Sequence, residues 1–232
     1  KKNENLIPIQ LDINNSKDIE SVINTIITKH KRLDVLINNA GIGISGMPES
    51  NSLKQIQDLF ETNYLGTFAI TQAIIPYMRK QNFGKIIFIG SSCGIEPSAA
   101  LAHYSALKAA IESLAISFAV SLKKWNILTS IIEPDGTKTD FIKKSPKGDF
   151  FTKKDPYQIT HTNFNNWLTN ILEEGSDPGS VAETIKKAIF DKKYQFRYAT
   201  NKAMEKLLTQ HLIDTEGTKF IDQQSNFFNQ FD

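Results

Sequence analysis

Residues 85–132 read KIIFIGSSCGIEPSAALAHYSALKAAIESLAISFAVSLKKWNILTSII and hold two aliphatic segments that flank one long helical pattern. The segments 85–89 and 127–132 are almost entirely apolar, as expected of strands that are covered on both faces of a parallel sheet. Between them, residues 101–124 are long enough to form a helix that returns the chain to the start of the next strand. This order of strand, helix and strand predicts an α/β fold.

The same alternation continues on both sides of this stretch. Toward the N-terminus we predict a strand over 6–13, a helix with Ser16 as its N-cap, a strand over 33–38 and helical structure over 53–81. Toward the C-terminus, residues 140–177 break the rhythm as an insertion with short helices. A helix from 177, the pair Arg197–Tyr198 and a last helix near 203–212 follow. We therefore predict one domain, residues 1–232, with a doubly wound, Rossmann-like parallel sheet in three layers.

Composition excludes several classes of function. The formal net charge of +2 gives no long-range field that would attract nucleic acid or an anionic membrane. The longest apolar runs are far shorter than the ~20 residues needed to span a bilayer, so we predict no membrane span. The one cysteine, Cys93, fits a reducing compartment, and we expect a cytoplasmic protein. The four histidines show no metal-ligand spacing, and we expect no metal.

Tyr104 and Lys108 lie four residues apart on a predicted helix, so their side chains project from the same face. A unit charge at ~4 Å and an effective dielectric of ~20 contributes about 4 kcal/mol, or roughly three pKa units. Lys108 would then bring the pKa of the Tyr104 phenol from about 10 toward neutrality. Such a phenol can give a proton to a carbonyl oxygen or take one from an alcohol. A Tyr and Lys pair alone is common on exposed helix faces, so more residues are needed.

Ser91 follows the strand 85–89 and would lie at the carboxyl end of the sheet, where open α/β folds bind ligands. Gly-Ser-Ser-Cys-Gly at 90–94, followed by Tyr-Ser-Ala-Leu-Lys at 104–108, resembles the active site of the short-chain dehydrogenase/reductase family. Ser92 is the alternative serine. The family serine lies three residues before a glycine and thirteen before the tyrosine, which fits Ser91 with Gly94 and Tyr104.

Three more motifs extend the resemblance over residues 6–141. Asn38-Asn39-Ala40-Gly41 after an aliphatic strand is similar to the family's strand-stabilising motif, and Asn63 in Thr-Asn-Tyr-Leu-Gly matches the fourth catalytic residue. Asp12 matches the acid that contacts the adenine ring. Farther along, Ser-Asp-Pro at 176–178 and Arg197–Tyr198 resemble a branch that includes hydroxysteroid and retinol dehydrogenases.

The resemblance implies an oxidoreductase that uses NAD or NADP on a carbonyl or secondary alcohol of a small, lipophilic molecule. Tyr104 would be general acid or base, and Lys108 would hold the nicotinamide ribose and depress the tyrosine pKa. Ser91 would position the substrate oxygen, and Asn63 would hold a water. The cofactor-binding residues implied by the family are Asp12, Asn39, Ala40, Gly41, Tyr104, Lys108, Pro134, Gly136, Thr137 and Thr139.

Two further expectations come from the resemblance. The aromatic residues of the 140–177 insertion, from Phe141 to Trp167, fall where the family has its mobile substrate lid, although ordinary packing explains them equally well. Small residues in three- and four-residue steps mark a surface that builds a subunit interface in the family, so we expect a homodimer or homotetramer. These residues are Ala106, Ala109, Ala110, Ser113, Ser117 and Ser121.

The sequence departs from the family pattern in two places. The family's glycine-rich loop has no counterpart and the chain begins with Lys1, so we expect that the first strand–helix–strand unit is missing and that this chain binds the cofactor poorly. Gly41, Gly43 and Gly46 spell the dinucleotide fingerprint, but Met-Pro-Glu at 47–49 delays the helix, and we reject this match. Asp135 replaces the usual glycine after Pro134; it is either harmless or an unwanted negative charge near the cofactor.

Two other classes of function remain as alternatives. The missing loop and Asp135 fit a dehydrogenase-fold scaffold or binding protein that no longer catalyses. A serine hydrolase using Ser91 with Lys108 would need a nucleophile elbow, and no G-x-S-x-G surrounds Ser91. Cys93 is expected to be a passive residue of the substrate pocket, because no histidine lies at an activating spacing.

Overall fold

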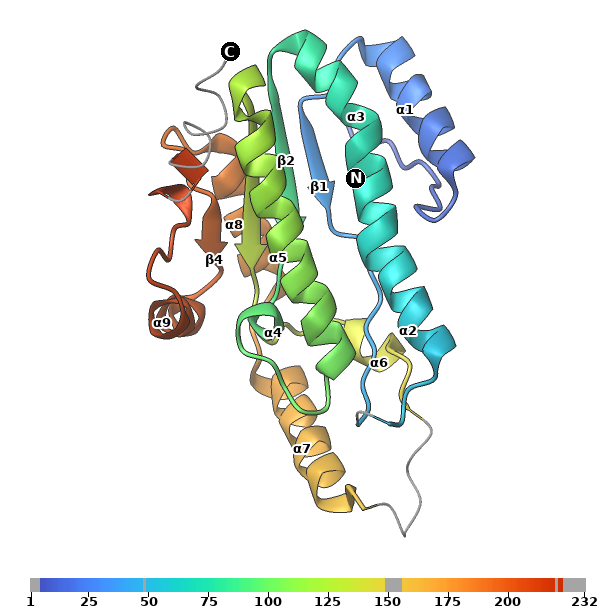
Figure 1. Cartoon of the computed structure of the whole chain (residues 1–232), viewed down its shortest axis with the longest axis vertical. Coiled ribbons are helices and arrows are strands. Elements are labelled where there is room, and N and C mark those ends of the chain that lie inside the picture. Colours follow the sequence, from blue (N-terminus) through green and yellow to red (C-terminus); the bar gives the residue numbers. More distant parts are fainter. Residues whose placement is uncertain (1–4, 48, 149–155, 220, 223–232) are drawn as a thin grey trace.

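A parallel sheet of four strands forms the centre of the protein (Figure 1). The computed structural model describes residues 5–47, 49–148, 156–219, 221 and 222. The strands follow the order of the sequence across the sheet, and each pairs in parallel with the next. They are β1 (Val35–Asn38), β2 (Gly84–Ile89), β3 (Ile127–Glu133) and β4 (Arg197–Ala199). The predicted α/β fold with a parallel sheet is confirmed.

Helices cover both faces of this sheet and make three layers. On one face α3 (Thr67–Gln81) and α5 (Ala102–Leu122) pack on β2 and β3, and α1 (Ser16–His30) lies beside α3. On the other face α8 (Pro178–Phe190) packs on β2 and β3. Alternate residues of each strand face the two layers, so Phe88 and Ile131 belong to one core cluster and Ile87 and Ile132 to the other.

The remaining elements lie at the ends of the strands. They are α2 (Leu53–Phe60), the π-helix η1 (Glu61–Gly66), α4 (Ser92–Ile95), the 3-10 helix η2 (Lys123–Trp125), α6 (Phe141–Lys144), α7 (Gln158–Glu174) and α9 (Lys202–His211). The strand arrows of Figure 1 point toward α4, α6 and α7, which therefore lie at the carboxyl ends of the strands. The predicted insertion is built by α6 and α7, and α7 with 17 residues is longer than the short helices expected. Residues 149–155 of the insertion, with Phe150 and Phe151, lie outside the described residues.

The predicted strand over 6–13 is wrong. Residues 6–12 have no strand structure, and Leu6, Ile7 and Ile9 are exposed. A β-prone segment becomes a strand only when a neighbouring strand takes up its backbone hydrogen bonds, and this segment pairs with no strand of the described chain. The N-cap of α1 is also one residue earlier than predicted, because Asn15 has extended backbone and its side chain accepts from the N–H groups of Lys17 and Asp18.

Helix α5 is apolar enough to qualify as a membrane span by length and composition alone. Within Ala102–Trp125, an 18-residue window has a mean hydropathy of 1.4 and 39% of that window is buried; this is the one such stretch in the described part of the chain. Isolated polar residues interrupt this stretch, so it contains no long unbroken apolar run. Leu107, Ile111 and Ala115 of α5 are buried in the cores beside the sheet. We therefore interpret α5 as a core helix, which can have the same length and composition as a membrane span.

Candidate active site

A cavity of about 630 Å³ opens where the polypeptide leaves β1, β2 and β3. Its apolar outer wall comes from α6 and α7, including Phe141, Phe164, Trp167 and Ile171. The residues that the sequence predicted for catalysis and cofactor binding line this cavity, with the exception of Asp12. They are Asn39, Ala40, Gly41, Asn63, Ser91, Tyr104, Lys108, Pro134, Gly136, Thr137 and Thr139. The fold therefore brings together residues that are spread over 100 positions of the chain (139 − 39).

Asp12 lies apart from this group. Its side chain is exposed and accepts a hydrogen bond from the backbone N–H of Asn14 at 2.9 Å, which closes a local turn. Contact with the adenine ring would require the strand that was predicted for residues 6–13. Because that segment is not in the sheet, the structure does not bring Asp12 to the cavity.

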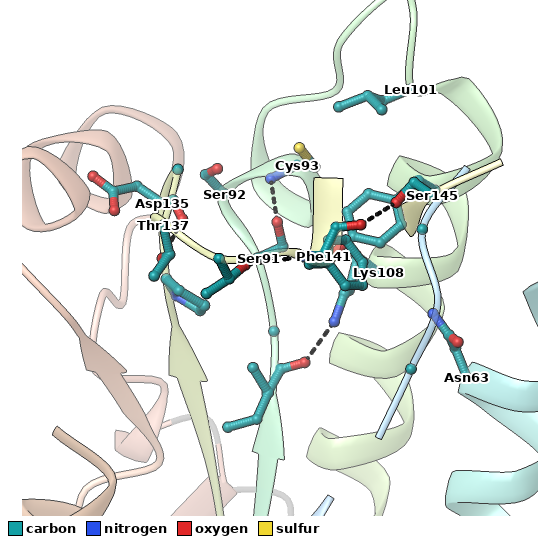
Figure 2. Close-up of a pocket in the computed structure, with 18 of the residues that line it drawn as sticks. Asn63, Ser91, Ser92, Cys93, Leu101, Lys108, Asp135, Thr137, Phe141 and Ser145 are labelled. Atoms are coloured by element: carbon teal, nitrogen blue, oxygen red, sulfur yellow. Dashed lines mark hydrogen bonds between the residues drawn. The ribbon is translucent and has the colours of Figure 1, made fainter. Parts of the chain in front are cut away.

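Ser91 is the N-cap of the short helix α4 and has extended backbone. Its hydroxyl oxygen accepts from the N–H of Cys93 at 3.2 Å, and its own N–H donates to the carboxylate of Glu133 at 3.0 Å. The Ser91 hydroxyl also faces the phenol of Tyr104, where its hydrogen bond lowers the pKa of the tyrosine. In Figure 2, Ser91 lies toward Lys108, whereas Ser92 lies toward Asp135. The geometry thus favours Ser91 over Ser92 as the partner of Tyr104.

Tyr104 and Lys108 both extend from α5 into the cavity wall, but Lys108 does not act on the phenol as predicted. The Lys108 ammonium donates to the backbone carbonyl of Ile89 at 2.8 Å, and it lies 5.6 Å from the centroid of the Tyr104 ring (Figure 2). Burial raises the pKa of Tyr104, and Lys108 is not among the groups that lower it. Burial lowers the pKa of Lys108 to about 8, against the opposing effect of Glu133.

The predicted depression of the Tyr104 pKa is therefore wrong for this arrangement. The prediction required the ammonium to lie next to the phenol oxygen, which the four-residue spacing permits but does not require. In the structure the ammonium is held by Ile89, and loss of hydration is the larger effect on both groups. The Tyr104 phenol is consequently protonated at neutral pH.

Asn63 lies in η1, where the helix between α2 and α3 widens into a π turn. Such single turns are frequent at functional sites, because they redirect one side chain without ending the helix. Both ends of the Asn63 amide are bound by Ile42: its oxygen accepts from the backbone N–H at 2.8 Å, and its nitrogen donates to the carbonyl at 2.7 Å. Asn63 therefore fixes the loop after β1. Its role in holding a water stays a prediction.

The glycines after β1 do not form a dinucleotide fingerprint. No helix begins within residues 41–46, and α2 starts only at Leu53. Gly43 has a different requirement: a Cβ atom there would lie 2.2 Å from the Ser145 hydroxyl and 2.9 Å from the Phe141 ring. The glycine thus allows the insertion to pack directly on this loop, and rejection of the fingerprint is confirmed.

Asp135 fits its position without strain. It is absent from the described non-glycine residues with positive φ, so it needs no glycine. Its carboxylate accepts from the Ser176 hydroxyl at 2.9 Å and from the Asn201 amide at 2.7 Å. In Figure 2 it points away from Lys108. Asp135 therefore joins the loop after β3 to the segments before α8 and α9 without backbone strain. Its carboxylate is bonded to neutral groups and lines the cavity, and the effect of its charge on a bound cofactor stays a prediction.

Sequence reasoning missed a buried ion network behind the cavity, formed by Glu112, Glu133 and Arg197. Glu133 is fully buried at the end of β3, and Arg197 contacts both carboxylates. The available signal was a glutamate that ends an otherwise apolar strand. Cys93, by contrast, behaves as expected of a passive residue, because burial raises the pKa of its thiol. Among the described residues no cluster of His, Cys, Asp and Glu could hold a metal ion, and the absence of a metal stays a prediction.

Comparison with known proteins gives consistent matches over most of the chain. Residues 1–149 match the family model described as short chain dehydrogenase. Retinol dehydrogenase 8 of Bos taurus is 28% identical over 226 residues, which cover 94% of this chain and 71% of that protein. A solved short-chain dehydrogenase from Streptomyces avermitilis is 28% identical, with a TM-score of 0.76 over 97% of this chain and 80% of that chain. A short chain dehydrogenase/reductase from Burkholderia phymatum in complex with NAD is 19% identical, with a TM-score of 0.74 over 92% of this chain and 76% of that one, and it shows the fold alone.

Proposed function

This chain belongs to the short-chain dehydrogenase family and is an oxidoreductase, and we propose that it interconverts a carbonyl and a secondary alcohol with Tyr104 as general acid or base. The observation that carries the proposal is that Ser91, Tyr104 and Lys108 meet in one cavity at the carboxyl ends of the strands. Open α/β folds bind their ligands at this edge.

The cofactor that we propose is NAD or NADP, and the cavity offers suitable partners for its nicotinamide end. Lys108 carries three N–H donors, and the bond to Ile89 uses one of them. The hydroxyl of Thr139 and the backbone of residues 39–41 line the same cavity. The solved short chain dehydrogenase/reductase from Burkholderia phymatum is a complex with NAD. When bound, the cofactor would give or accept a hydride, and the protein would supply orientation and electrostatics.

The chain's own groups would move the proton. Because burial raises the pKa of Tyr104, its phenol is protonated at neutral pH and can donate to a carbonyl oxygen. The Ser91 hydroxyl, which faces the phenol, would orient the same oxygen. Lys108, with a pKa near 8, keeps most of its positive charge at pH 7 and would favour negative charge that develops there. A protonated Tyr104 phenol and a charged Lys108 ammonium suit the reduction of a carbonyl group.

The substrate that we propose is small and lipophilic. Apolar side chains of α6 and α7 form the outer wall of the cavity, and retinol dehydrogenase 8 of Bos taurus is a relative named for a lipophilic alcohol. A second cavity of about 760 Å³ shares Cys93, Phe164, Trp167 and Ile171 with the first. A substrate longer than the first cavity would extend into this second one, toward α9.

Substitution of Tyr104 by phenylalanine tests the proposal. It keeps the ring that packs against Phe141 and removes the proton donor. Reduction of all-trans-retinal and of the ketosteroid estrone, followed through oxidation of NADH or NADPH, should fall by about a hundredfold or more. Cofactor binding, measured by fluorescence, should change little. A variant that turns over either compound at the wild-type rate would exclude Tyr104 as the acid or base.

A homo-oligomer is proposed from the surface of α5. Ala106, Ala109, Ser113, Ser117 and Ser121 are exposed, so burial against the chain's own sheet does not explain this row of small residues. Small side chains permit close approach of another helix, and we propose that a second copy of the chain packs there.

A further inference from the structure

Three charged residues from separate elements are buried together beside the cavity. Glu133 ends β3, Arg197 begins β4 and Glu112 lies on α5, four residues after Lys108. Their relative exposures are 0% for Glu133, 5% for Arg197 and 8% for Glu112. Charges that are so deeply buried are costly unless they are paired, and here each has a partner of opposite sign.

Glu133 connects this group to the site. One oxygen of its carboxylate accepts from the Arg197 Nε at 3.3 Å, and the other accepts from the backbone N–H of Ser91 at 3.0 Å. A second nitrogen of Arg197 donates to Glu112. A continuous chain of contacts thus runs from the serine backbone to the helix that carries Tyr104 and Lys108.

The space around Gly90 shows how closely this carboxylate is fitted. A Cβ atom at Gly90 would lie 2.3 Å from the Glu133 Oε2, which is the oxygen that holds Ser91. Residue 90 therefore has to be glycine for the carboxylate to reach the next N–H. The missing side chain at residue 90 thus leaves the space that the Glu133 carboxylate occupies beside Ser91.

Stability alone is a weak explanation for such a network. Buried ion groups of this kind often give no net stability over well-packed apolar residues, because desolvation offsets their attraction. Burial and the neighbouring Glu112 raise the pKa of Glu133 well above its usual range, against the opposing effect of Arg197. A costly network that contacts the backbone of Ser91 is better explained by the position in which it holds that residue.

We propose that Glu133 is a positioning residue that fixes Ser91 through its backbone N–H, and that Arg197 and Glu112 join this restraint to α5. The serine hydroxyl and the tyrosine hydroxyl then keep one spacing around the substrate oxygen. The inference rests on the proposed function. Since Glu133 acts through Ser91, its removal should lower kcat and leave cofactor affinity unchanged.

A double-mutant cycle tests this role. Glu133→Met keeps the volume but cannot accept a hydrogen bond, whereas the amide oxygen of Glu133→Gln still can. With whichever of estrone and all-trans-retinal the wild type reduces faster, Glu133→Met should lower kcat by up to about a hundredfold, since misplacement of a reacting group by about 1 Å can cost that much. Glu133→Gln should recover most of the loss. In a Ser91→Ala background, Glu133→Met should have a much smaller effect, limited to what the loss of Glu133 does to the charge of Lys108.

Gly90→Ala provides the same test if Glu133→Met does not fold. Its methyl group displaces the carboxylate from Ser91, so it should lower kcat in the wild type and have no effect in the Ser91→Ala background. Losses that add in the Ser91→Ala background would overturn the positioning role and leave the proposed function intact. If Ser91→Ala or Tyr104→Phe were as active as the wild type, the proposed function itself would fail.

Discussion

Lys108 shows how one partly buried residue shapes the chemistry of the site. Its ammonium is held by the carbonyl of Ile89, and burial lowers its pKa from 10.5 to about 8. The same burial raises the pKa of Tyr104, which keeps the phenol in its proton-donating form. A cation in such a place is costly to the fold, and we expect that it is retained for its action on substrate and cofactor.

Replacement of Lys108 by methionine should therefore stabilise the protein while removing its activity. Below pH 8 the lysine is charged in both the folded and the unfolded chain, and its burial costs the fold about 1–3 kcal/mol. Between pH 8 and 10.5 the unfolded chain binds more protons than the folded one, so wild-type stability rises with pH.

Urea unfolding of both proteins at about pH 7 and about pH 10 measures this difference. The advantage of Lys108→Met should be present at the lower pH and should shrink at the higher one. An advantage that grows with pH would contradict the lowered pKa of Lys108.

At the scale of elements, the site lies at the carboxyl ends of the strands, and side chains from neighbouring elements fix the loops that follow these strands. The loop after β1 is fixed by Asn63 from the π turn η1, and the loop after β3 is fixed by Asp135 through Ser176 and Asn201. Helix α5 has two working surfaces: its N-terminal end presents Tyr104 and Lys108 to the cavity, and its outer face presents the exposed row of small residues.

Ser113→Arg tests the outer face of α5. A long charged side chain in the middle of the small-residue row should prevent close helix approach, and light scattering should show a shift to the mass of one chain. Thr25→Arg, on the exposed face of α1, is the matched control and should leave the mass of the wild-type assembly unchanged. A wild-type protein that is already monomeric would contradict the proposed oligomer.

On the scale of the whole molecule, the cavity lies between the sheet and the 140–177 insertion. The sheet provides the polar groups, and α6 and α7 provide the apolar wall. The two parts meet where Gly43 packs against Phe141 and Ser145, and where Ser45 pairs with Lys147. Phe141 also packs against the ring of Tyr104, but Tyr104 and Lys108 are both carried by α5. We therefore expect this contact to affect substrate affinity more than chemistry.

Gly43→Val should weaken the attachment of the insertion. The added side chain would overlap Ser145 and Phe141, so the apolar wall has to move away from the sheet. We expect the KM for retinal or estrone to rise about tenfold, with a smaller change in kcat, because the groups on α5 stay in place. Steady-state kinetics gives both values, and an unchanged KM with a reduced kcat would contradict this division.

The sequence by itself determined the α/β alternation and the set of residues that meet at the cavity. The alternation depends on local periodicity, whereas the site residues were identified from their resemblance to the short-chain dehydrogenase/reductase active site. The four-residue spacing of Tyr104 and Lys108 and the place of Ser91 after a strand agree with that resemblance. Residues 6–13 show where local pattern fails, because strand formation needs a partner that the segment itself does not contain.

Only the tertiary structure decided which groups touch and how deeply they are buried. The pKa of Tyr104 rises rather than falls because burial removes part of its hydration and the Lys108 ammonium binds Ile89, neither of which the four-residue spacing determines. Arg197 reaches Glu133 and Glu112 from 64 and 85 residues away. Such contacts depend on how distant elements pack together, and the free energy of a charge depends on that packing more than on its neighbours in sequence.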